Sequence, residues 1–399
     1  MSSALIVPER NERERPLAVV EAGLASPSVD RVYVVDGWST DGTDQLLAER
    51  LPELGERHGK PVELVRSRLR NTGKGGAMVT GIQQALADGS DRIAFLDADI
   101  TSMTSAWCDL LIEGVDRYKV AVTRGAFDRS PHDAQITRHI TRPLMNRFFP
   151  EGREITQPLG GELCMSGELA RWYLEGNVAP PHTWGIDTFF TVNGLVGGFR
   201  SAEIYLVQKT HNRKGLEDLR HMFVECFDEM AVEIHLHARD RSLPVRTESL
   251  VTVVPKEASQ LPRVGDDVRI RGYVDLQAEV ARFAQGLAAE PVSEEELERL
   301  GLPEEGRAFL LRLFGDPDGF AEGSRALDAG RWVSLLERLV QGYIASEFDP
   351  GFHKALFHIW RARALAFILH EASDFETAEQ NTQRLADLAF RRGQERLTV

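Results

Sequence analysis

The stretch "RIAFLDADITSM" at residues 92–103 decides the fold class, because it is a short apolar run that ends in two acidic residues. Similar apolar runs occur at residues 4–9, 31–37, 62–67 and 118–127. Amphipathic helical patterns separate the first four of these five runs and occupy residues 15–26, 43–58 and 75–88. Apolar strands that alternate with helices are typical of a mostly parallel sheet. We therefore predict an α/β fold with helices on both faces of the sheet.

The chain changes character after about residue 215. A long amphipathic segment at 216–240 is followed by a proline-containing turn-and-strand stretch at 243–267. The remaining sequence has helical periodicity, over about residues 268–288, 293–313, 322–347, 352–371 and 375–395. A chain of 399 residues exceeds the size of one hydrophobic core. We predict a catalytic domain at 1–240 and a mainly α-helical domain at 241–399, through which the protein forms a homo-oligomer.

Composition excludes several classes of protein. The net charge of −14 argues against a nucleic-acid partner, since phosphate backbones select basic surfaces. No signal peptide and no apolar run of about 18 residues is present, so we expect a cytoplasmic protein without membrane spans. Cys108, Cys164 and Cys226 are far apart and odd in number, which argues against a disulfide framework or a zinc knuckle.

The two aspartates of the opening stretch form a D-x-D motif with Ala98 between Asp97 and Asp99. On an extended chain both carboxylates point to the same side, where their repulsion is costly unless a cation lies between them. Mg²⁺ or Mn²⁺ prefers such oxygen ligands and commonly bridges to substrate phosphates. An isolated D-x-D is frequent by chance, so its position at the end of a buried strand carries the prediction.

Two further motifs follow predicted strands. In "VVDGWSTDGT" (34–43) a strand ends at Asp36, and Thr40 or Asp41 is placed to cap the next helix. A carboxylate there can accept hydrogen bonds from a base or a ribose. In "NTGKGGAMVTGI" (71–82) glycines open a helix beside Lys74, which favours an anion, although the Walker spacing is absent. Each motif is also compatible with an ordinary turn.

Three later motifs add polar side chains. "TQPLGGELCM" (156–165) predicts a tight turn that carries Glu162 and backbone amides toward a ligand. In "TWGIDTFF" (183–190) Asp187 is either the cap of a helix or a catalytic carboxylate. In "VQKTHNRKG" (207–215) a strand is expected to end at His211, and a histidine is a common third ligand where two carboxylates hold a metal.

Taken in order, these motifs resemble the GT-A glycosyltransferases. Within them the chain is most similar to the mannosylglycerate synthases and more distantly to the glucosyl-3-phosphoglycerate synthases, over about residues 4–230. "QPLGGEL", "WGID" and "LRHMFVECF" are its most specific parts. The resemblance implies a GT-A, nucleotide-diphospho-sugar transferase fold. It also implies metal-dependent, retaining transfer of a hexosyl group from GDP-mannose or UDP-glucose to D-glycerate, with 3-phosphoglycerate as the alternative acceptor.

The same resemblance implies a role for each site residue. Asp99 and His211 would bind the divalent metal, and Asp187 and Glu162 would act in catalysis. The donor and its sugar would be bound by Pro8, Glu9, Asp36, Lys74, Asp97, Ala98, Leu159, Gly160 and Gly161. Arg124 would pair with the acceptor carboxylate, for which a bidentate guanidinium is well suited. His132 stands near the acceptor where the family pattern has a small hydroxyl residue. Its charge and that of Arg129, Arg213 and Lys214 either favour a phosphorylated acceptor or belong to solvated loops.

Two other classes of protein are less consistent with the sequence. A sugar-nucleotide pyrophosphorylase requires a glycine-rich loop after the first strand, where this chain has the charged, glycine-free "PERNERERP". A non-catalytic carbohydrate- or nucleotide-binding protein would not need the intact set of Asp97, Asp99, Asp187 and His211. A single turnover assay distinguishes that class from an enzyme.

Overall fold

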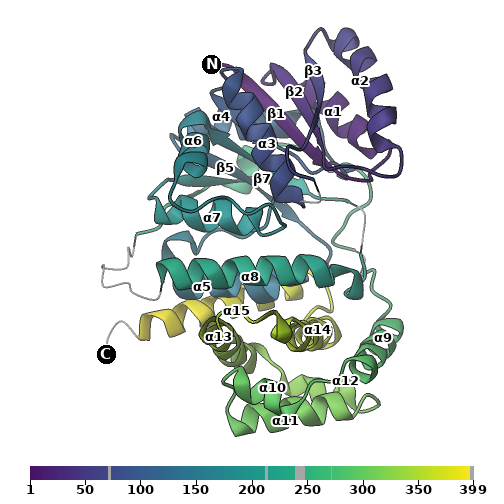
Figure 1. The fold of residues 1–399 in the computed structure, drawn as a ribbon, viewed down its shortest axis with the longest axis vertical. Helices are drawn as coiled ribbons and strands as arrows, with labels where there is room; N and C mark the ends of the chain where they lie inside the picture. The colour runs from purple at the N-terminus through teal and green to yellow at the C-terminus, as the bar shows by residue number, and fades with distance from the viewer. Residues whose placement is uncertain (71–72, 212–213, 239–247, 271, 396–399) are drawn as a thin grey trace. The chain divides into compact units, whose positions relative to one another are not determined.

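The computed structural model describes residues 1–70, 73–211, 214–238, 248–270 and 272–395. It divides into two compact units, which are described separately (Figure 1). The sheet unit contains Met1–Asp128, Glu154–Asn212 and Glu248–Val268, and the helical unit contains Arg129–Arg153, Arg213–Thr247 and Arg269–Val399. The predicted boundary at 240/241 lies outside the described residues. Each unit takes residues from both sides of it, because the chain passes between the units several times.

Within the described residues the sheet unit contains one sheet in the order β3-β2-β1-β4-β6-β5-β7-β8. Its strands are β1 (Ser3–Glu9), β2 (Arg31–Asp36), β3 (Val62–Arg66), β4 (Arg92–Phe95), β5 (Val122–Asp128), β6 (Leu163–Ser166), β7 (Ser201–Gln208) and β8 (Val251–Val253). All neighbouring strands are parallel except at β6, which is antiparallel to β4 and β5. The predicted α/β class is therefore confirmed. β1 to β5 correspond to the five predicted apolar runs and β7 to the strand expected before His211, while β6 and β8 extend the sheet further.

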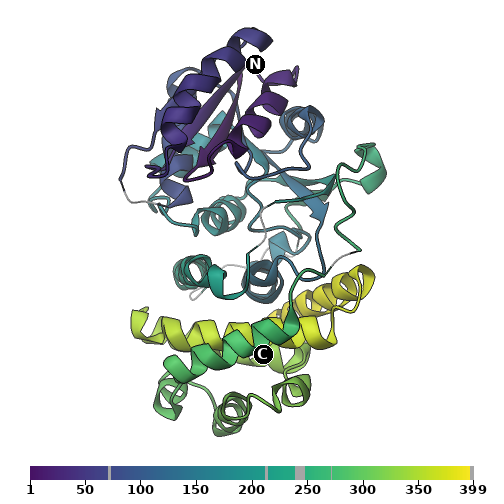
Figure 2. The same cartoon turned by 90° about the vertical axis from the view of Figure 1, so that its right-hand side faces the viewer.

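Helices cover both faces of this sheet, as Figures 1 and 2 show. Successive side chains of β1 alternate between the faces, so that Leu5 and Val7 enter one apolar core while Ala4 and Ile6 enter the other. The first core includes residues of α1 (Arg15–Ala25), α2 (Thr43–His58) and α4 (Ser105–Arg117). The second includes residues of α3 (Lys74–Ala87), α6 (Gly167–Glu175) and α7 (Ile186–Val196). The predicted two-sided covering is confirmed.

The start of α2 differs from the sequence prediction. Its cap is Gly42, in the left-handed region at φ 91°, and not Thr40 or Asp41. Asp41 instead accepts hydrogen bonds from the backbone N–H and the hydroxyl of Thr43, at 3.1 and 2.6 Å. A glycine adopts this backbone conformation without the strain that a side chain would add.

The helical unit is built from helices that pack through aromatic side chains. Its helices are η1 (Thr137–Thr141), α5 (Arg142–Phe148), η2 (Pro150–Gly152), η3 (Glu217–Leu219), α8 (Arg220–His237), α9 (Leu276–Ala289), α10 (Glu294–Arg299), α11 (Glu304–Gly315), α12 (Phe320–Gly323), η5 (Ser324–Ala326), α13 (Ala329–Ala345), η6 (Pro350–Phe352), α14 (His353–His370) and α15 (Phe375–Glu395). Phe223 of α8 stacks on Trp360 of α14, and Phe227 lies against Tyr343 of α13. The helical character predicted for this part of the chain is confirmed.

Among the described residues, no helix is both long enough and apolar enough to cross a bilayer. The longest helix, α15, has the bounds predicted from its periodicity, whereas the predicted helix at 293–313 is two helices, α10 and α11. The break falls at Gly301 and Pro303, where Gly301 has a φ of 72° and Pro303 caps α11.

Candidate active site

The D-x-D motif lies beyond β4, because that strand ends at Phe95. Asp97 and Asp99 occupy the irregular segment and turn that follow, so the alternation of an extended strand does not orient them. Ala98 is buried in the apolar core and contributes packing there. The expectation that both carboxylates point to one side as strand residues is therefore wrong.

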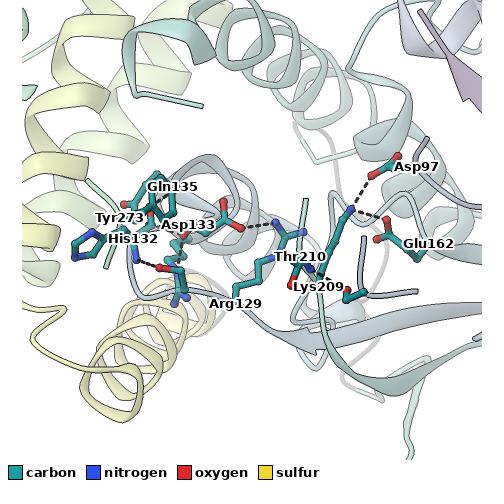
Figure 3. A network of polar contacts seen from close by, with 12 residues as sticks. Asp97, Arg129, His132, Asp133, Gln135, Glu162, Lys209, Thr210 and Tyr273 are labelled. Atoms are coloured by element: carbon teal, nitrogen blue, oxygen red, sulfur yellow. Dashed lines mark hydrogen bonds and ion pairs between the residues drawn. The ribbon is translucent and has the colours of Figure 1, made fainter. Parts of the chain in front are cut away.

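Five charged side chains of the sheet unit form a continuous series of ion pairs, which we call the carboxylate–lysine chain: Asp187, Lys74, Asp97, Lys209 and Glu162. Lys74 Nζ lies 2.8 Å from Asp187 Oδ2 and 2.9 Å from Asp97 Oδ1. Lys209 Nζ lies 2.7 Å from Asp97 Oδ2 and 2.5 Å from Glu162 Oε1, and Figure 3 shows it directed at both carboxylates. Asp97 thus has an ammonium group on each oxygen.

Burial makes these contacts strong. The side chains of Lys74, Lys209, Asp187 and Glu162 are at most 7% exposed, so salt and water screen them little. Burial alone would raise the pKa of Asp97, but the ammonium groups of Lys209 and Lys74 hold that pKa well below its usual range. Burial alone would lower the pKa of Lys74, and the carboxylates of Asp187 and Asp97 raise it overall. Lys74 therefore carries positive charge in the site.

Asp187 differs from Asp97 in its electrostatics. It lies in the first turn of α7, one residue inside the helix, whose cap is Gly185. Burial is the main cause that raises the pKa of Asp187, the Asp97 carboxylate adds to it, and Lys74 opposes it. Its Oδ1 has no hydrogen-bond partner among the described residues. A buried carboxylate with one open oxygen and a raised pKa is suited to accept a proton from a ligand hydroxyl.

Hydrogen bonds hold the segments that carry Asp99 and His211 side by side. Thr101 donates through its backbone N–H to the Thr210 carbonyl at 2.9 Å, and Thr210 N–H donates to Ser102 Oγ at 2.9 Å. β7 ends at Gln208, so His211 lies three residues past the strand and not at its end as predicted. Both candidate ligands therefore follow the carboxyl ends of parallel strands, beside one pair of tied loops.

The residue types at these loops fit a divalent metal. Neither oxygen of Asp99 has a hydrogen-bond or ion-pair partner among the described residues, which leaves a half-buried hard ligand available. No three His, Cys, Asp or Glu side chains within the described ranges are grouped as a metal cage. Asp99 and His211 stay the predicted protein ligands, and a bound diphosphate and water would fill the other positions around the ion, as is usual for Mg²⁺.

The glycines at the start of α3 have a structural role that the sequence analysis missed. The amides of Gly75 and Gly76 donate to the carbonyls of Thr183 and His182, both at 3.1 Å, so these two amides are not open to a phosphate. A Cβ on Gly75 would lie 2.2 Å from the Pro181 carbonyl oxygen. These contacts dock the segment before Asp187 onto the first turn of α3, which begins at Lys74. The motif thus brings Lys74 and Asp187 together. Its Asn71 and Thr72 lie outside the described residues.

The predicted nucleoside-binding residues lie at the ends of β1 and β2. Glu9 pairs in register with Asp36, and Pro8 with Val35. Burial and the adjacent Asp36 carboxylate raise the pKa of Glu9 to about 9, so Glu9 is protonated at neutral pH. Asp36 accepts a hydrogen bond from the Ser39 amide at 2.9 Å. Two buried carboxyl groups, one of them protonated, are thus held side by side at this edge.

The predicted sugar-pocket turn is fixed to β7. The amides of Thr156 and Gln157 donate to Glu203 Oε1 at 2.7 and 3.1 Å, and the Thr156 hydroxyl donates to Oε2 at 2.9 Å. Gly160 N–H closes the turn on the Gln157 carbonyl at 2.9 Å, beside the half-buried Leu159. The turn delivers Gly161 and Glu162 to the carboxylate–lysine chain.

Gly161 lies against the carboxylate–lysine chain, which gives a first prediction. A Cβ at this position would lie 2.4 Å from Asp97 Oδ1 and 2.5 Å from Lys74 Nζ. We expect Gly161→Ala to separate that ion pair and to lower kcat about 100-fold, the order of cost for misplacing catalytic groups by about 1 Å. The matched control is Gly89→Ala, where no atom lies within 4 Å, although its φ of 76° adds some strain. Steady-state kinetics and circular dichroism of both variants check this, and wild-type kcat in Gly161→Ala would contradict it.

Arg124 of β5 is a buried cation without a partner. It is 3% exposed, and its Nε and Nη1 make no hydrogen bond to the described residues. Its register partner on β7 is Glu203, whose oxygens accept from residues 156 and 157. Burial lowers the pKa of Arg124, while Tyr173, Asp187 and Glu203 act in the opposite direction. Since burying an unpaired charge costs free energy, a bound anion would stabilise this guanidinium.

His132 belongs to the helical unit, and its described contacts are with that unit. Its Nδ1 accepts a hydrogen bond from the Val274 amide at 3.1 Å, and its ring fills the space where a Cβ on Gly272 would lie. Burial lowers the pKa of His132. These contacts give the ring a structural role that the sequence analysis did not foresee, and a role near the acceptor stays a prediction.

Lys209 is the charged residue of this site that the sequence analysis missed. In the sequence it stood among several basic residues of one segment, which concealed it. The signal that distinguishes it is its position directly after the buried run at the end of β7, since a lysine there must reach a carboxylate.

The model of the mannosylglycerate synthase glycosyltransferase domain matches residues 6–232 of this chain. The mannosylglycerate synthase of Rhodothermus marinus is 29% identical over 403 positions, which cover 96% of this chain and 93% of that protein. The glucosyl-3-phosphoglycerate synthase of Mycolicibacterium smegmatis is 27% identical over 55% of this chain and 73% of its own. The solved glucosyl-3-phosphoglycerate synthase of Mycobacterium tuberculosis with Mg²⁺ and uridine diphosphate is 20% identical, with a TM-score of 0.48 over 58% of this chain and 79% of that one.

Proposed function

Because the chain belongs to the mannosylglycerate synthase family of glycosyltransferases, we propose that it moves a hexosyl group from a nucleotide sugar to D-glycerate. The donor is GDP-mannose or UDP-glucose, the reaction retains the anomeric configuration, and it depends on Mg²⁺ or Mn²⁺. The observation that carries the choice of acceptor is Arg124, a buried guanidinium with two open nitrogen atoms. A small carboxylate satisfies both its charge and its planar, bidentate geometry.

Different residues of the sheet unit have different roles in the proposed reaction. Asp99 and His211 would hold a divalent cation, which would supply positive charge to the leaving nucleoside diphosphate. Lys74 adds a charged donor for the phosphates from its place between Asp97 and Asp187. Arg124 holds the acceptor carboxylate, and the open Oδ1 of Asp187 accepts the proton of the attacking hydroxyl. Most of the rate enhancement then comes from stabilising the charge of the leaving group and not from covalent chemistry.

Two basic residues favour D-glycerate over 3-phosphoglycerate. A phosphorylated acceptor would need additional positive charge, for which the sequence offers Arg129, His132, Arg213 and Lys214, of which Lys214 is exposed. In the helical unit Arg129 Nη1 lies 3.1 Å from Asp133 Oδ2, and burial keeps the pKa of His132 low. Within that unit the charge of Arg129 is thus paired with a carboxylate, and His132 is neutral at neutral pH. Arg213 lies outside the described residues.

The experiment is a screen of two donors against two acceptors. Purified protein is incubated with GDP-mannose or UDP-glucose and with D-glycerate or 3-phosphoglycerate, each with Mn²⁺ or with EDTA. We expect the highest kcat/KM for one donor with D-glycerate, an α-linked product by NMR, and loss of turnover in EDTA. Transfer only to 3-phosphoglycerate would overturn the acceptor. Undiminished turnover after chelation would overturn the metal dependence.

Arg124 gives a prediction specific to the acceptor. We expect Arg124→Met to raise the KM for D-glycerate about 100-fold, the order of cost of losing a charged hydrogen-bonded partner, with little change in the KM for the donor. Arg117→Met is the matched control, because Arg117 is about half exposed and, in the part of the chain that the structure describes, pairs with Glu113 alone, on its own helix. Initial rates over both substrates give the two KM values. Equal increases in both KM values would show that Arg124 does not select the acceptor.

A further inference from the structure

Lys209 is held in place from several directions within the sheet unit. Its backbone N–H donates to the Asp128 carbonyl at 3.2 Å, which continues the β5–β7 ladder. Its side chain is 6% exposed, and Nζ lies 5.6 Å from the centre of the Phe127 ring. From there the ammonium contacts Asp97, which follows β4, and Glu162, which precedes β6 (Figure 3). One cation therefore links side chains from three strands.

The charges around Lys209 are nearly balanced. Asp187, Asp97 and Glu162 supply three negative charges to the carboxylate–lysine chain, and Lys74 and Lys209 supply two positive ones. A divalent cation that took Asp97 as a ligand would compete with an ammonium group, since each Asp97 oxygen already has one. Among the described residues no hydrogen bond or ion pair joins Asp99 to a cation, and Arg15 acts on it only as a more distant charge.

We propose that Lys209 is a positioning residue that reserves Asp97 and Glu162 for the donor and keeps both carboxylates from binding the divalent metal. The metal is then held by Asp99 and His211 with help from the diphosphate, and it stays exchangeable. Mg²⁺ sites in phosphate-transferring enzymes commonly use one or two carboxylates in this way. A cage of three or four carboxylates would bind the metal more tightly and leave less charge for the leaving group. The inference rests on the metal dependence proposed above.

The experiment compares Lys209→Met with the wild type in two measurements. The first is the dissociation constant of Mn²⁺ alone, from the electron paramagnetic resonance signal of free Mn²⁺ without any substrate. We expect Lys209→Met to bind Mn²⁺ at least about 10-fold more tightly, because a competing positive charge has been removed beside carboxylates. The second is turnover, which we expect to fall about 100-fold at saturating Mn²⁺, because Asp97 and Glu162 lose their orientation.

Two further variants separate positioning from stability. Lys209→Arg keeps the charge, so we expect wild-type Mn²⁺ affinity together with partial recovery of kcat. Lys256→Met is the matched control, since Lys256 is a 65% exposed lysine of the same unit, and both measurements should remain at wild-type values. Where Lys209→Met fails to fold by circular dichroism, Lys209→Gln removes the same charge with a polar side chain and carries the same expectation.

The outcomes distinguish this inference from the proposed function. Unchanged or weaker Mn²⁺ binding in the folded Lys209→Met variant overturns the inference and leaves a metal-dependent wild-type enzyme intact. A wild-type protein that binds no Mn²⁺ and transfers sugar in EDTA overturns both. The positioning role is supported if Lys209→Met binds Mn²⁺ more tightly and has a lower kcat, and if Lys209→Arg restores wild-type affinity and part of kcat. Loss of a residue that acted only on stability would not increase the affinity for Mn²⁺.

Discussion

Lys74→Met is expected to lower kcat/KM for the nucleotide sugar about 1000-fold, the upper range for removing one preorganised charged donor. Lys74 is the cation that both Asp97 and Asp187 share, at 2.9 and 2.8 Å. Without it, Asp187 is a buried carboxylate beside another carboxylate, and its tendency to hold a proton increases. The variant therefore loses a phosphate contact and alters the proton acceptor. Steady-state kinetics and calorimetric titration with GDP and UDP measure both effects.

An arginine at position 74 would keep the positive charge but change its shape, and we do not expect it to restore kcat/KM. A Cβ on Gly161 would lie only 2.5 Å from Lys74 Nζ, so the space around the ammonium has no room for a planar guanidinium. We expect Lys74→Arg to stay within about tenfold of Lys74→Met, because packed sites tolerate added atoms poorly. Lys119→Met, at an exposed lysine of the same unit, is the control and should keep wild-type kinetics. Full activity in Lys74→Arg would show that the charge alone matters.

Asp99→Ala is expected to lower kcat about 1000-fold or more, because it removes a carboxylate ligand from the candidate metal site. The fold should be unaffected, since no hydrogen bond or ion pair joins the Asp99 side chain to the described residues. We expect a melting temperature within a few degrees of the wild type, as for a surface substitution. Added Mn²⁺ should not recover the rate. The measurements are kcat over a Mn²⁺ titration and the thermal transition.

The control for Asp99→Ala is Asp91→Ala, which removes an exposed carboxylate just before β4 and should leave kcat and its Mn²⁺ dependence unchanged. Retention of wild-type turnover by Asp99→Ala would exclude Asp99 from the site. A large drop in melting temperature would instead assign it a structural role.

Much of the sheet unit could be predicted from sequence because apolar runs and helical periods are local signals. β1 and β2 end at Glu9 and Asp36, the two carboxyl residues singled out at those ends. β6 was missed because four residues after a glycine pair carry too little periodicity to identify a strand. The sequence also could not show that residues 248–268 return to the sheet unit, since that depends on long-range pairing.

The sequence predicted which residues belong to the site better than it predicted which of them contact each other. Lys74, Asp97, Glu162 and Asp187 were all singled out, and the structure links them in the carboxylate–lysine chain. The D-x-D pattern predicted a divalent cation beside Asp97, and the resemblance implied that Asp97 binds the donor; its observed partners are Lys74 and Lys209. Which charges meet depends on side chains that are more than 100 residues apart, as Lys209 and Asp97 are. No spacing rule within one motif reports such a pairing.

The reversed direction of β6 has a consequence for where this enzyme can be lengthened. Leu163 pairs with Phe95 at the site edge, and Ser166 pairs with Arg92 at the far edge. Glu162 therefore directly precedes the first residue of β6, whereas Asp97 follows the last residue of β4. A peptide inserted just after Glu175, where α6 ends, leaves the register of Glu162 untouched, and one inserted between Gly160 and Glu162 displaces it directly. We therefore expect the chain to tolerate insertions after α6 and not in the turn that precedes β6.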